Sequence, residues 1–164
     1  VLRHTTTSQS GGEVMEEQTV VYRDDPKPEA AGAPAKPARP ITPMPAADFS
    51  RSVTPNEVML FRYSALTFNG HRIHYDAPYA KEVEGYPGLV VHGPLIATLL
   101  LELLRAHEPA RKVETFSFRA LSPLFAPDRF TVNGAPAADG RTVKLWAANH
   151  QGDLAMEANA TLVA

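Results

Sequence analysis

The strongest hydrophobic pattern in the chain lies over residues 94–105, a segment that is almost entirely apolar. Pro94 suits the first turn of a helix because it lacks the N–H group that would have no partner there. Leucine and isoleucine side chains then cover most of the helix circumference, and Glu102 is nearly the only polar residue among them. A helix that is apolar on all sides is usually wrapped by other elements. The pattern therefore predicts a buried central helix.

Four strands are predicted after this helix, over residues 112–120, 129–134, 142–149 and 154–162. Phe116 and Phe118, like Val143 and Leu145, show the period-two alternation of half-buried strands. The segments between the strands hold the Asp, Gly and Pro residues that favour turns. A sheet that curls around the single helix accommodates this pattern most simply. The predicted fold class is therefore α+β, an antiparallel sheet wrapped around one long apolar helix.

A shorter helix is predicted to end near residue 66. Thr54 is its expected N-cap, Pro55 its first residue, and Glu57 completes a capping box. One apolar face is predicted along it, formed by Val58, Phe61, Ala65 and Leu66. The elements that follow are a loop, a short helical turn and a short buried strand, over residues 67–76, 77–81 and 89–91.

The region before this domain divides into a hairpin and a linker. Residues 1–24 predict a β-hairpin around Gln-Ser-Gly-Gly, and two strands alone are marginal in water, so the hairpin must dock elsewhere. The chain opens on residues that look like a strand, and we expect that an upstream part was lost or belongs to another chain. Residues 25–47, rich in Pro and Ala, predict an extended surface linker, and residues 48–164 the main domain.

Composition and charge exclude several classes of function. The 164 residues suffice for one domain, or for one domain plus a fragment. A net charge of −2 gives no indication of a nucleic-acid or anionic-membrane partner. The absence of cysteine excludes disulfides, thiolate chemistry and Cys-based metal sites, and it fits the cytoplasmic location that we expect. The longest apolar run, 95–101, is far too short to span a bilayer.

Candidate chemistry gathers in three histidines, His71, His74 and His92. A metal site is disfavoured because the His-x-x-His pair has no convincing third ligand, carboxylate or Cys, placed nearby. The histidines could instead pack and hydrogen-bond within loops. Alternatively they could perform acid–base catalysis, for which histidine is the most common group because its pKa lies near the working pH.

Three runs of residues carry a family resemblance: Thr54-Pro-Asn-Glu57, Ser64-Ala-Leu-Thr-Phe-Asn-Gly-His-Arg-Ile-His-Tyr-Asp76 and Val91-His-Gly-Pro-Leu-Ile-Ala-Thr-Leu-Leu100. They resemble the MaoC-like hydratase/dehydratase family. The resemblance is to its double-hotdog branch, with type 2 hydroxyacyl-thioester dehydratases and mesaconyl- or itaconyl-CoA hydratases. It implies a hotdog fold, in which residues 1–24 are the remnant of an upstream, degenerate hotdog.

The family's usual motif is Asp-x-Asn-x-x-His, whose Asp and His hold the catalytic water. Aligned on His74, the Asp position holds Asn69 and the Asn position holds His71. Asparagine orients a water but cannot act as a base, so His74 must be the base, or share that work with His71. The resemblance implies His74 as acid/base and Asn69 as water positioner. Gly93, just before Pro94 at the start of the predicted helix, is well placed to supply the oxyanion-stabilising N–H, although an ordinary turn glycine is the alternative.

The implied activity is hydration of a 2-enoyl thioester, or dehydration of the 3-hydroxyacyl thioester in reverse. No metal or redox cofactor is implied, since coenzyme A or acyl carrier protein is part of the substrate. The predicted substrate-binding residues are His71, Arg72 and His92. Arg72 would pair with a substrate carboxylate or a CoA phosphate, or simply face solvent.

Two other functions stay open at this point. A thioesterase on this fold usually places an Asp or Glu against the central helix, and Glu102 as the only carboxylate there argues against it. A non-catalytic acyl-thioester-binding subunit is suggested by Asn69. A lone hotdog sheet exposes a strand edge, so we expect a homo-oligomer or pairing with an upstream hotdog domain.

Overall fold

The computed structural model describes residues 1–20 and 46–163. The chain divides into two compact units, a hairpin near the N-terminus and the main domain, and each is described by itself. The predicted linker lies outside the described residues except for its last two positions, and so does the end of the predicted hairpin, residues 21–24.

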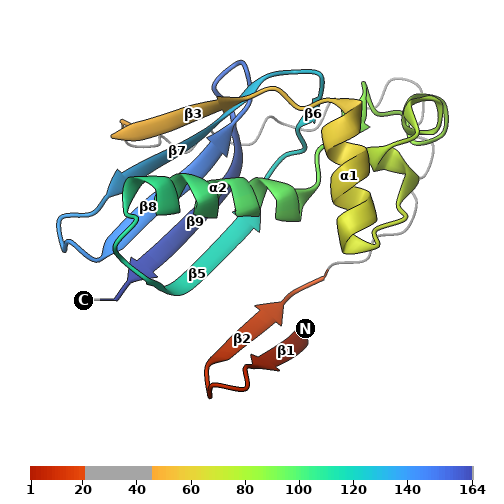
Figure 1. Cartoon of the computed structure of the whole chain (residues 1–164). Coiled ribbons are helices and arrows are strands. Elements are labelled where there is room, and N and C mark those ends of the chain that lie inside the picture. The colour runs from red at the N-terminus through yellow and green to blue at the C-terminus, as the bar shows by residue number, and fades with distance from the viewer. Residues whose placement is uncertain (21–45, 164) are drawn as a thin grey trace. The chain divides into compact units, whose positions relative to one another are not determined.

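The main domain is built on a five-stranded antiparallel sheet of order β3-β7-β8-β9-β5 (Figure 1). Its strands are β3 (Phe49–Val53), β5 (Val113–Ala120), β7 (Phe130–Pro136), β8 (Thr142–Ala148) and β9 (Leu154–Leu162). The last four confirm the strands predicted after the central helix. Strand β3 was missed because Phe-Ser-Arg-Ser-Val has apolar residues only at its ends, and its pairing with β7 decides its conformation.

Helix α2 (Gly93–His107) lies across this sheet and packs on β3, β7, β8 and β9. Leu100 and Leu104 are almost fully buried there, against side chains of the sheet such as Leu145 and Met156. The predicted α+β architecture, an antiparallel sheet around one apolar helix, is confirmed. The helix is longer than predicted by one residue at its start and two at its end.

Helix α1 (Glu57–Thr67) departs from the prediction at its start. Its N-cap is Asn56, whose Oδ1 accepts the backbone N–H of Met59 at 2.8 Å. The prediction of Thr54 was therefore wrong. Asparagine is among the best N-cap residues, and its short side chain reaches the free N–H group directly.

The buried face of α1 also differs from the prediction. Val58, Phe61 and Leu66 are 62%, 59% and 79% exposed, whereas Leu60 and Ser64 are buried. Apolar spacing therefore identified the outer face of the helix, because the inner face includes a hydroxyl with a polar partner in the site described below.

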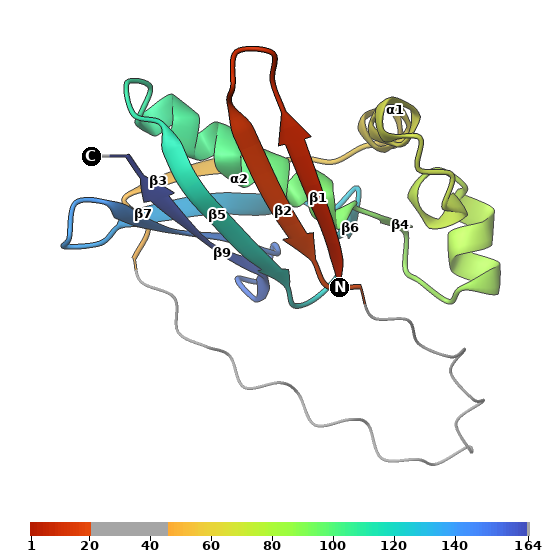
Figure 2. The ribbon, with the colours of Figure 1, turned by 90° about the horizontal axis from the view of Figure 1, so that it is seen from below.

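Short elements complete the domain between α1 and β7. They are the 3-10 helix η1 (Arg72–His74), the π-helical turn η2 (Tyr79–Val83), β4 (Leu89–Val90) and β6 (Phe125–Ala126). Figure 2 shows β4 and β6, which pair antiparallel, near the N-terminal end of α2. Strand β4 was predicted, and β6 was not.

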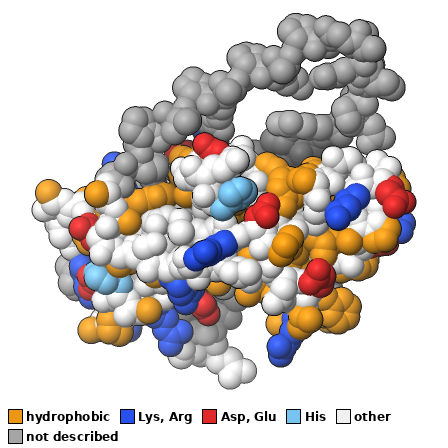
Figure 3. Space-filling view, turned by 90° about the horizontal axis from the view of Figure 1, so that it is seen from above, with side chains coloured by type: hydrophobic (Ala, Val, Ile, Leu, Met, Phe, Trp, Pro, Cys, Tyr) orange, Lys and Arg blue, Asp and Glu red, His pale blue; other side chains and the backbone are white. Residues whose placement is uncertain are grey.

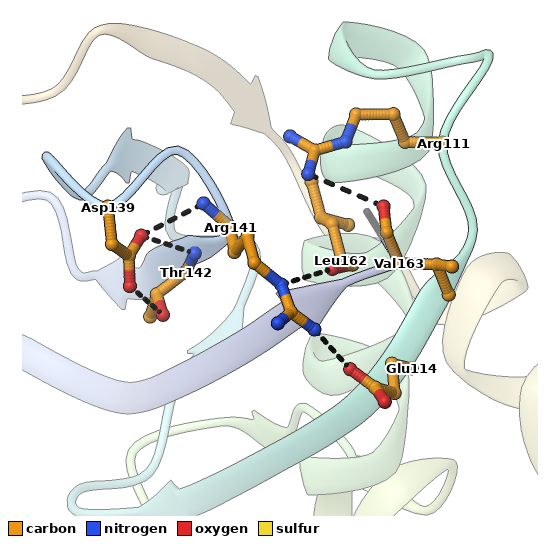
Figure 4. Close-up of polar contacts among 7 residues, drawn as sticks. All are labelled: Arg111, Glu114, Asp139, Arg141, Thr142, Leu162 and Val163. Atoms are coloured by element: carbon orange, nitrogen blue, oxygen red, sulfur yellow. Dashed lines mark hydrogen bonds and ion pairs between the residues drawn. The ribbon is translucent and has the colours of Figure 1, made fainter.

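Two arginines tie the ends of β5 and β9 together (Figure 4). Arg141 donates from Nε to the Leu162 carbonyl at 3.3 Å and from Nη2 to Glu114 at 2.8 Å. Arg111 donates to the Val163 carbonyl at 3.4 Å. These contacts attach β5, the last strand of the sheet, to the end of β9.

No helix among the described residues is long and apolar enough to cross a membrane. On the face drawn in Figure 3, acidic and basic side chains are interspersed. The coloured part of that face therefore lacks the continuous basic stripe that is typical of nucleic-acid binding.

The N-terminal unit is the predicted hairpin, β1 (Leu2–Thr7) and β2 (Glu13–Gln18), paired antiparallel. Its turn has the same hydrogen bonds as the β8–β9 turn. Gly11 donates to the Ser8 carbonyl and Gly152 to the Asn149 carbonyl, both at 3.0 Å. Both glycines have positive φ, 86° and 90°. In both turns the first side chain accepts the N–H four residues further on, at 3.0 Å for Ser8 and 2.8 Å for Asn149.

Aligning these two glycines also aligns the sequences of the two hairpins. Met15-Glu16 falls opposite Met156-Glu157, and Gln18 opposite Asn159. Every residue of β1 and β2 is exposed, and His4 stands where β8 has the buried Leu145. The N-terminal hairpin therefore resembles the last hairpin of the main domain in turn geometry and in part of its sequence, but it is more polar.

Candidate active site

The loop that carries the predicted motif begins at a left-handed residue after α1. Phe68 has φ 54°, and the N–H of Asn69 donates to the Ser64 carbonyl at 2.9 Å. This is a Schellman-type helix end. The Oδ1 of Asn69 then accepts the N–H of His71 at 3.0 Å. The side-chain oxygen is thus used within the loop, and its NH₂ group has two hydrogens with which to hold a water.

His74, at the end of η1, is 7% exposed. Its Nδ1 lies 2.7 Å from the carbonyl oxygen of Val90 in β4. Because a carbonyl only accepts, Nδ1 must carry the hydrogen, and Nε2 of the neutral ring has a free lone pair. This is the tautomer that a general base requires.

Strand β4 is held tightly enough to fix that carbonyl. Leu89 and Val90 pair with β6, and Gly88 just before them comes close to the β6 backbone. A Cβ at Gly88 would lie 2.6 Å from the carbonyl oxygen of Ala126, so glycine is required by the close approach. The acceptor for His74 is therefore set by backbone pairing.

The pKa of His74 is lowered from its ordinary value. Burial of the ring is the largest cause, and repulsion from a charged His71 adds to it, while the hydrogen bond to Val90 acts in the opposite direction. The ring is consequently neutral at neutral pH, with its Nε2 available to take a proton.

The structure brings the three predicted histidines together. The rings of His74 and His92 are stacked, with centroids 3.7 Å apart and planes inclined by 17°. The ring of His71 stands edge-on to His74 at 5.7 Å. His92 is 1% exposed, and burial, with repulsion from His74, lowers its pKa to about 4.

Ser64 completes this cluster and was not singled out from the sequence. Its Oγ lies 2.8 Å from Nε2 of His92, and its side chain is buried on the inner face of α1. The available signal was its spacing of four residues from Leu60, which places both on one helical face. The apolar residues of the outer face obscured that signal.

Gly93, the predicted oxyanion donor, is the first residue of α2. The N–H groups of a first helical turn lack partners within the helix, and the helix dipole favours negative charge beside them. A Cβ added to Gly93 would meet no atom within 4 Å, so space is open beside this backbone. The position fits the predicted role.

Arg72 already has an intramolecular partner. It donates to Oδ2 of Asp76 from Nε and Nη2, at 3.0 and 2.7 Å, and its guanidinium lies 4.1 Å from the centre of the Tyr79 ring. The hydrogen bond to Asp76 is the main cause that raises the pKa of Arg72. The predicted substrate-binding roles of Arg72, His71 and His92 stay predictions, and for Arg72 only the remaining N–H groups are available.

The described residues contain no group of three or more His, Asp or Glu side chains arranged to hold a metal ion. Glu102, the carboxylate of the central helix, is 61% exposed in its side chain and forms an ion pair with Arg51 at 3.5 Å. It therefore lies outside the histidine cluster, which weakens the thioesterase alternative further.

The sequence matches one protein family and is similar to two known enzymes. The family model for hydroxyacyl-thioester dehydratase type 2 matches residues 1–126. Mesaconyl-C(4)-CoA hydratase of Chloroflexus aurantiacus is 46% identical over 150 residues, which are 91% of this chain and 50% of that protein. The mitochondrial hydroxyacyl-thioester dehydratase type 2 of Schizosaccharomyces pombe is 50% identical over 74 residues, 44% of this chain and 25% of that protein. The chain thus spans at most about half the length of these relatives.

Comparison with solved structures supports the hotdog fold. The (R)-hydratase from A. caviae involved in PHA biosynthesis superposes with a TM-score of 0.62 at 20% identity, over 73% of this chain and 96% of that chain. The ChsH1-ChsH2 complex from Mycobacterium tuberculosis gives a TM-score of 0.59 at 19% identity, over 71% of this chain and 94% of that chain. At these identities the likeness establishes the fold alone.

Proposed function

The chain belongs to the hydroxyacyl-thioester dehydratase type 2 family, and from this premise we propose that it hydrates a 2-enoyl thioester, or dehydrates the 3-hydroxyacyl thioester in reverse. The observation that carries the proposal is the buried His74 ring, whose Nδ1–H is fixed by Val90 and whose Nε2 is left as a base.

In the proposed hydration, a water donates a hydrogen bond to Nε2 of His74 and accepts one from the NH₂ group of Asn69. His74 takes the proton while the water oxygen attacks C3, and the electrons of the C2–C3 bond move towards the thioester oxygen. His74 then returns the proton to C2, so that water is added across the double bond.

The thioester oxygen gains negative charge between these two proton transfers. The N–H of Gly93 supports its stabilisation, because it lies at the positive end of the α2 dipole and has open space beside it. The backbone donor is fixed before the reaction, so no reorganisation is needed when the charge develops.

We propose a coenzyme A thioester with a short acyl group, of the mesaconyl or crotonyl type, as the substrate. The identity of 46% to a mesaconyl-C(4)-CoA hydratase over 91% of this chain supports this choice. A non-catalytic acyl-thioester-binding subunit is the second candidate, favoured by Asn69 at the position where the family motif has an Asp. The cytoplasmic location stays a prediction.

We further propose that strand β5 pairs with another hotdog unit. It ends the sheet, and Val113 and Phe118 on it are 40% and 47% exposed. An apolar cavity of about 400 Å³ lies between β5 and the C-terminal half of α2, lined by residues that include Leu101 and Phe116. A second sheet would continue β5 and cover this cavity. Two of the solved relatives with this fold, ChsH1-ChsH2 and HadBC, are described as complexes.

The N-terminal hairpin is, in our proposal, the last hairpin of an upstream hotdog unit with a degenerate core. The support is its match to the β8–β9 hairpin in turn geometry and sequence, together with the family match, which includes the hairpin. Strand β1 has polar residues at positions where β8 has buried ones. A unit that has lost its active site would tolerate such residues.

The first test is turnover of crotonyl-CoA and mesaconyl-C(4)-CoA, followed as loss of the conjugated thioester. His74→Ala should reduce kcat/KM by at least about 10²-fold, the lower end for a general base. Asn69→Ala should reduce it by about tenfold, the worth of one hydrogen bond. The control His150→Ala, an exposed histidine in the β8–β9 turn, should leave it unchanged. Unchanged activity in His74→Ala would contradict the mechanism, and tight binding without turnover across the panel would favour the binding subunit.

The pairing of β5 is tested by light scattering. The purified 17.8 kDa chain should show at least twice that mass, and Phe118→Lys should shift it towards the monomer because a charge would be buried in the new contact. The control Val83→Lys, a residue 68% exposed on η2, should keep the wild-type mass. A stable wild-type monomer at micromolar concentration contradicts the proposal.

Amide hydrogen exchange tests the origin of the hairpin. In this chain the amides of β1 and β2 should be poorly protected, since a lone hairpin is marginal in water. In a polypeptide that includes the proposed upstream unit they should exchange at least about 10²-fold more slowly, as amides of a packed sheet do. Equal exchange in both polypeptides would rule out that the hairpin completes an upstream sheet.

A further inference from the structure

The His92 ring has an environment unlike that of a substrate contact. It is 1% exposed, its Nε2 is hydrogen-bonded to Ser64, and its face is stacked on His74. On another side the Tyr63 ring approaches edge-on at 4.9 Å. The ring is therefore enclosed by α1 and by the proposed base, and it does not reach solvent.

The hydrogen-bonding state of His92 follows from its unpaired nitrogen. Nδ1 is buried and has no hydrogen-bond partner in the structure. A buried N–H without a partner is rarer in proteins than an acceptor without one. The hydrogen therefore belongs on Nε2, which donates it to Oγ of Ser64, and Nδ1 is a bare lone pair. A second proton on this ring would have no acceptor among the described residues.

The base of the proposed mechanism lacks the carboxylate that would normally orient it and stabilise its charged form. Among the described residues, no carboxylate forms a hydrogen bond or an ion pair with His74 or His92. His71 faces the stack from the loop before η1, Tyr63 faces it from α1, and β4 contributes the Val90 carbonyl. The contacts that orient His74 are thus one hydrogen bond, the closely stacked His92 ring and the more distant edge of His71.

We propose that Ser64 and His92 form a positioning pair, in which the Ser64 hydroxyl locks a neutral His92 ring that holds His74 in its reactive orientation. The inference rests on the proposed function and assigns His92 a role other than the substrate contact predicted from the sequence. Stacking on His92 fixes the plane of the His74 ring, and the hydrogen bond to Val90 fixes the direction in which Nδ1 points within that plane. The His92 ring, held by Ser64, also excludes water from the face of His74 on which it is stacked.

The pair predicts the direction of a pH effect. Burial is the main cause that lowers the pKa of His74, so a loosened His92 would admit water and raise it towards 6.5. Because the neutral ring is the active form, the acid limb of kcat/KM should then move to higher pH. A purely structural role for Ser64 would lower the stability of the protein without moving this limb.

The test is a double-mutant cycle on enoyl-CoA hydration, with Ser64→Ala, His92→Phe and the double variant. Ser64→Ala should lower kcat about tenfold at unchanged KM, as expected for a misoriented base, and should move the acid limb of kcat/KM to higher pH. His92→Phe retains a ring against His74 but offers Ser64 no hydrogen bond, so adding Ser64→Ala to it should change kcat by less than about twofold. Thr67→Ala, which removes an exposed hydroxyl from the same helix, is the matched control and should behave as wild type.

Ser64→Ala with a wild-type kcat and acid limb would overturn the pairing, as would an equal loss in the His92→Phe background. Melting curves show whether each variant is folded. A second measurement needs no turnover: NMR titration of the His74 ring should give a higher midpoint in Ser64→Ala than in wild type. If the wild-type protein proves inactive, the proposed function fails, and this titration still decides the pair, because equal midpoints would overturn it.

Discussion

The hydrogen bond from Nδ1 of His74 to the carbonyl of Val90 is the interaction on which the site depends. A buried imidazole must satisfy its polar atoms, and a carbonyl acceptor allows only one tautomer of the neutral ring. The elements on both sides of this hydrogen bond maintain it. The close approach at Gly88 and the pairing of β4 with β6 hold the acceptor, and η1 holds the donor.

The pKa of His74 depends on its neighbours, and this site has Asn69 where the family motif has an Asp. A carboxylate would stabilise the charged form of the histidine and so raise its pKa. Here the Val90 carbonyl and the stacked, neutral His92 ring contact the proposed base, His74, and burial lowers its pKa. In the proposed mechanism His74 is therefore a weaker base that is mainly unprotonated at neutral pH, and its conjugate acid returns the proton readily to carbon.

The sequence predicted the parts of the structure that depend on local periodicity. Helix α2 and strands β5, β7, β8 and β9 were found because their apolar spacing is strong and their turns hold Gly, Asp or Pro. Strands β3 and β6 were missed because they are short and are stabilised by distant partners. The motif drew attention to His71 and His74, and the run before the central helix to His92, but the stacking and the Val90 contact depend on tertiary structure. Ser64 was not predicted because the apolar pattern of α1 indicated the wrong buried face. The apolar residues of that face are exposed in the structure, and the opposite face, which includes Ser64, is buried.

The central claim is that His74 is a neutral base with its hydrogen on Nδ1, and ¹⁵N NMR of the ring nitrogens at neutral pH tests it most directly. The account predicts a protonated Nδ1 and an unprotonated Nε2 for His74, because its Nδ1 faces the carbonyl oxygen of Val90 at 2.7 Å. A hydrogen on Nε2 with a bare Nδ1, or a doubly protonated ring, would contradict it.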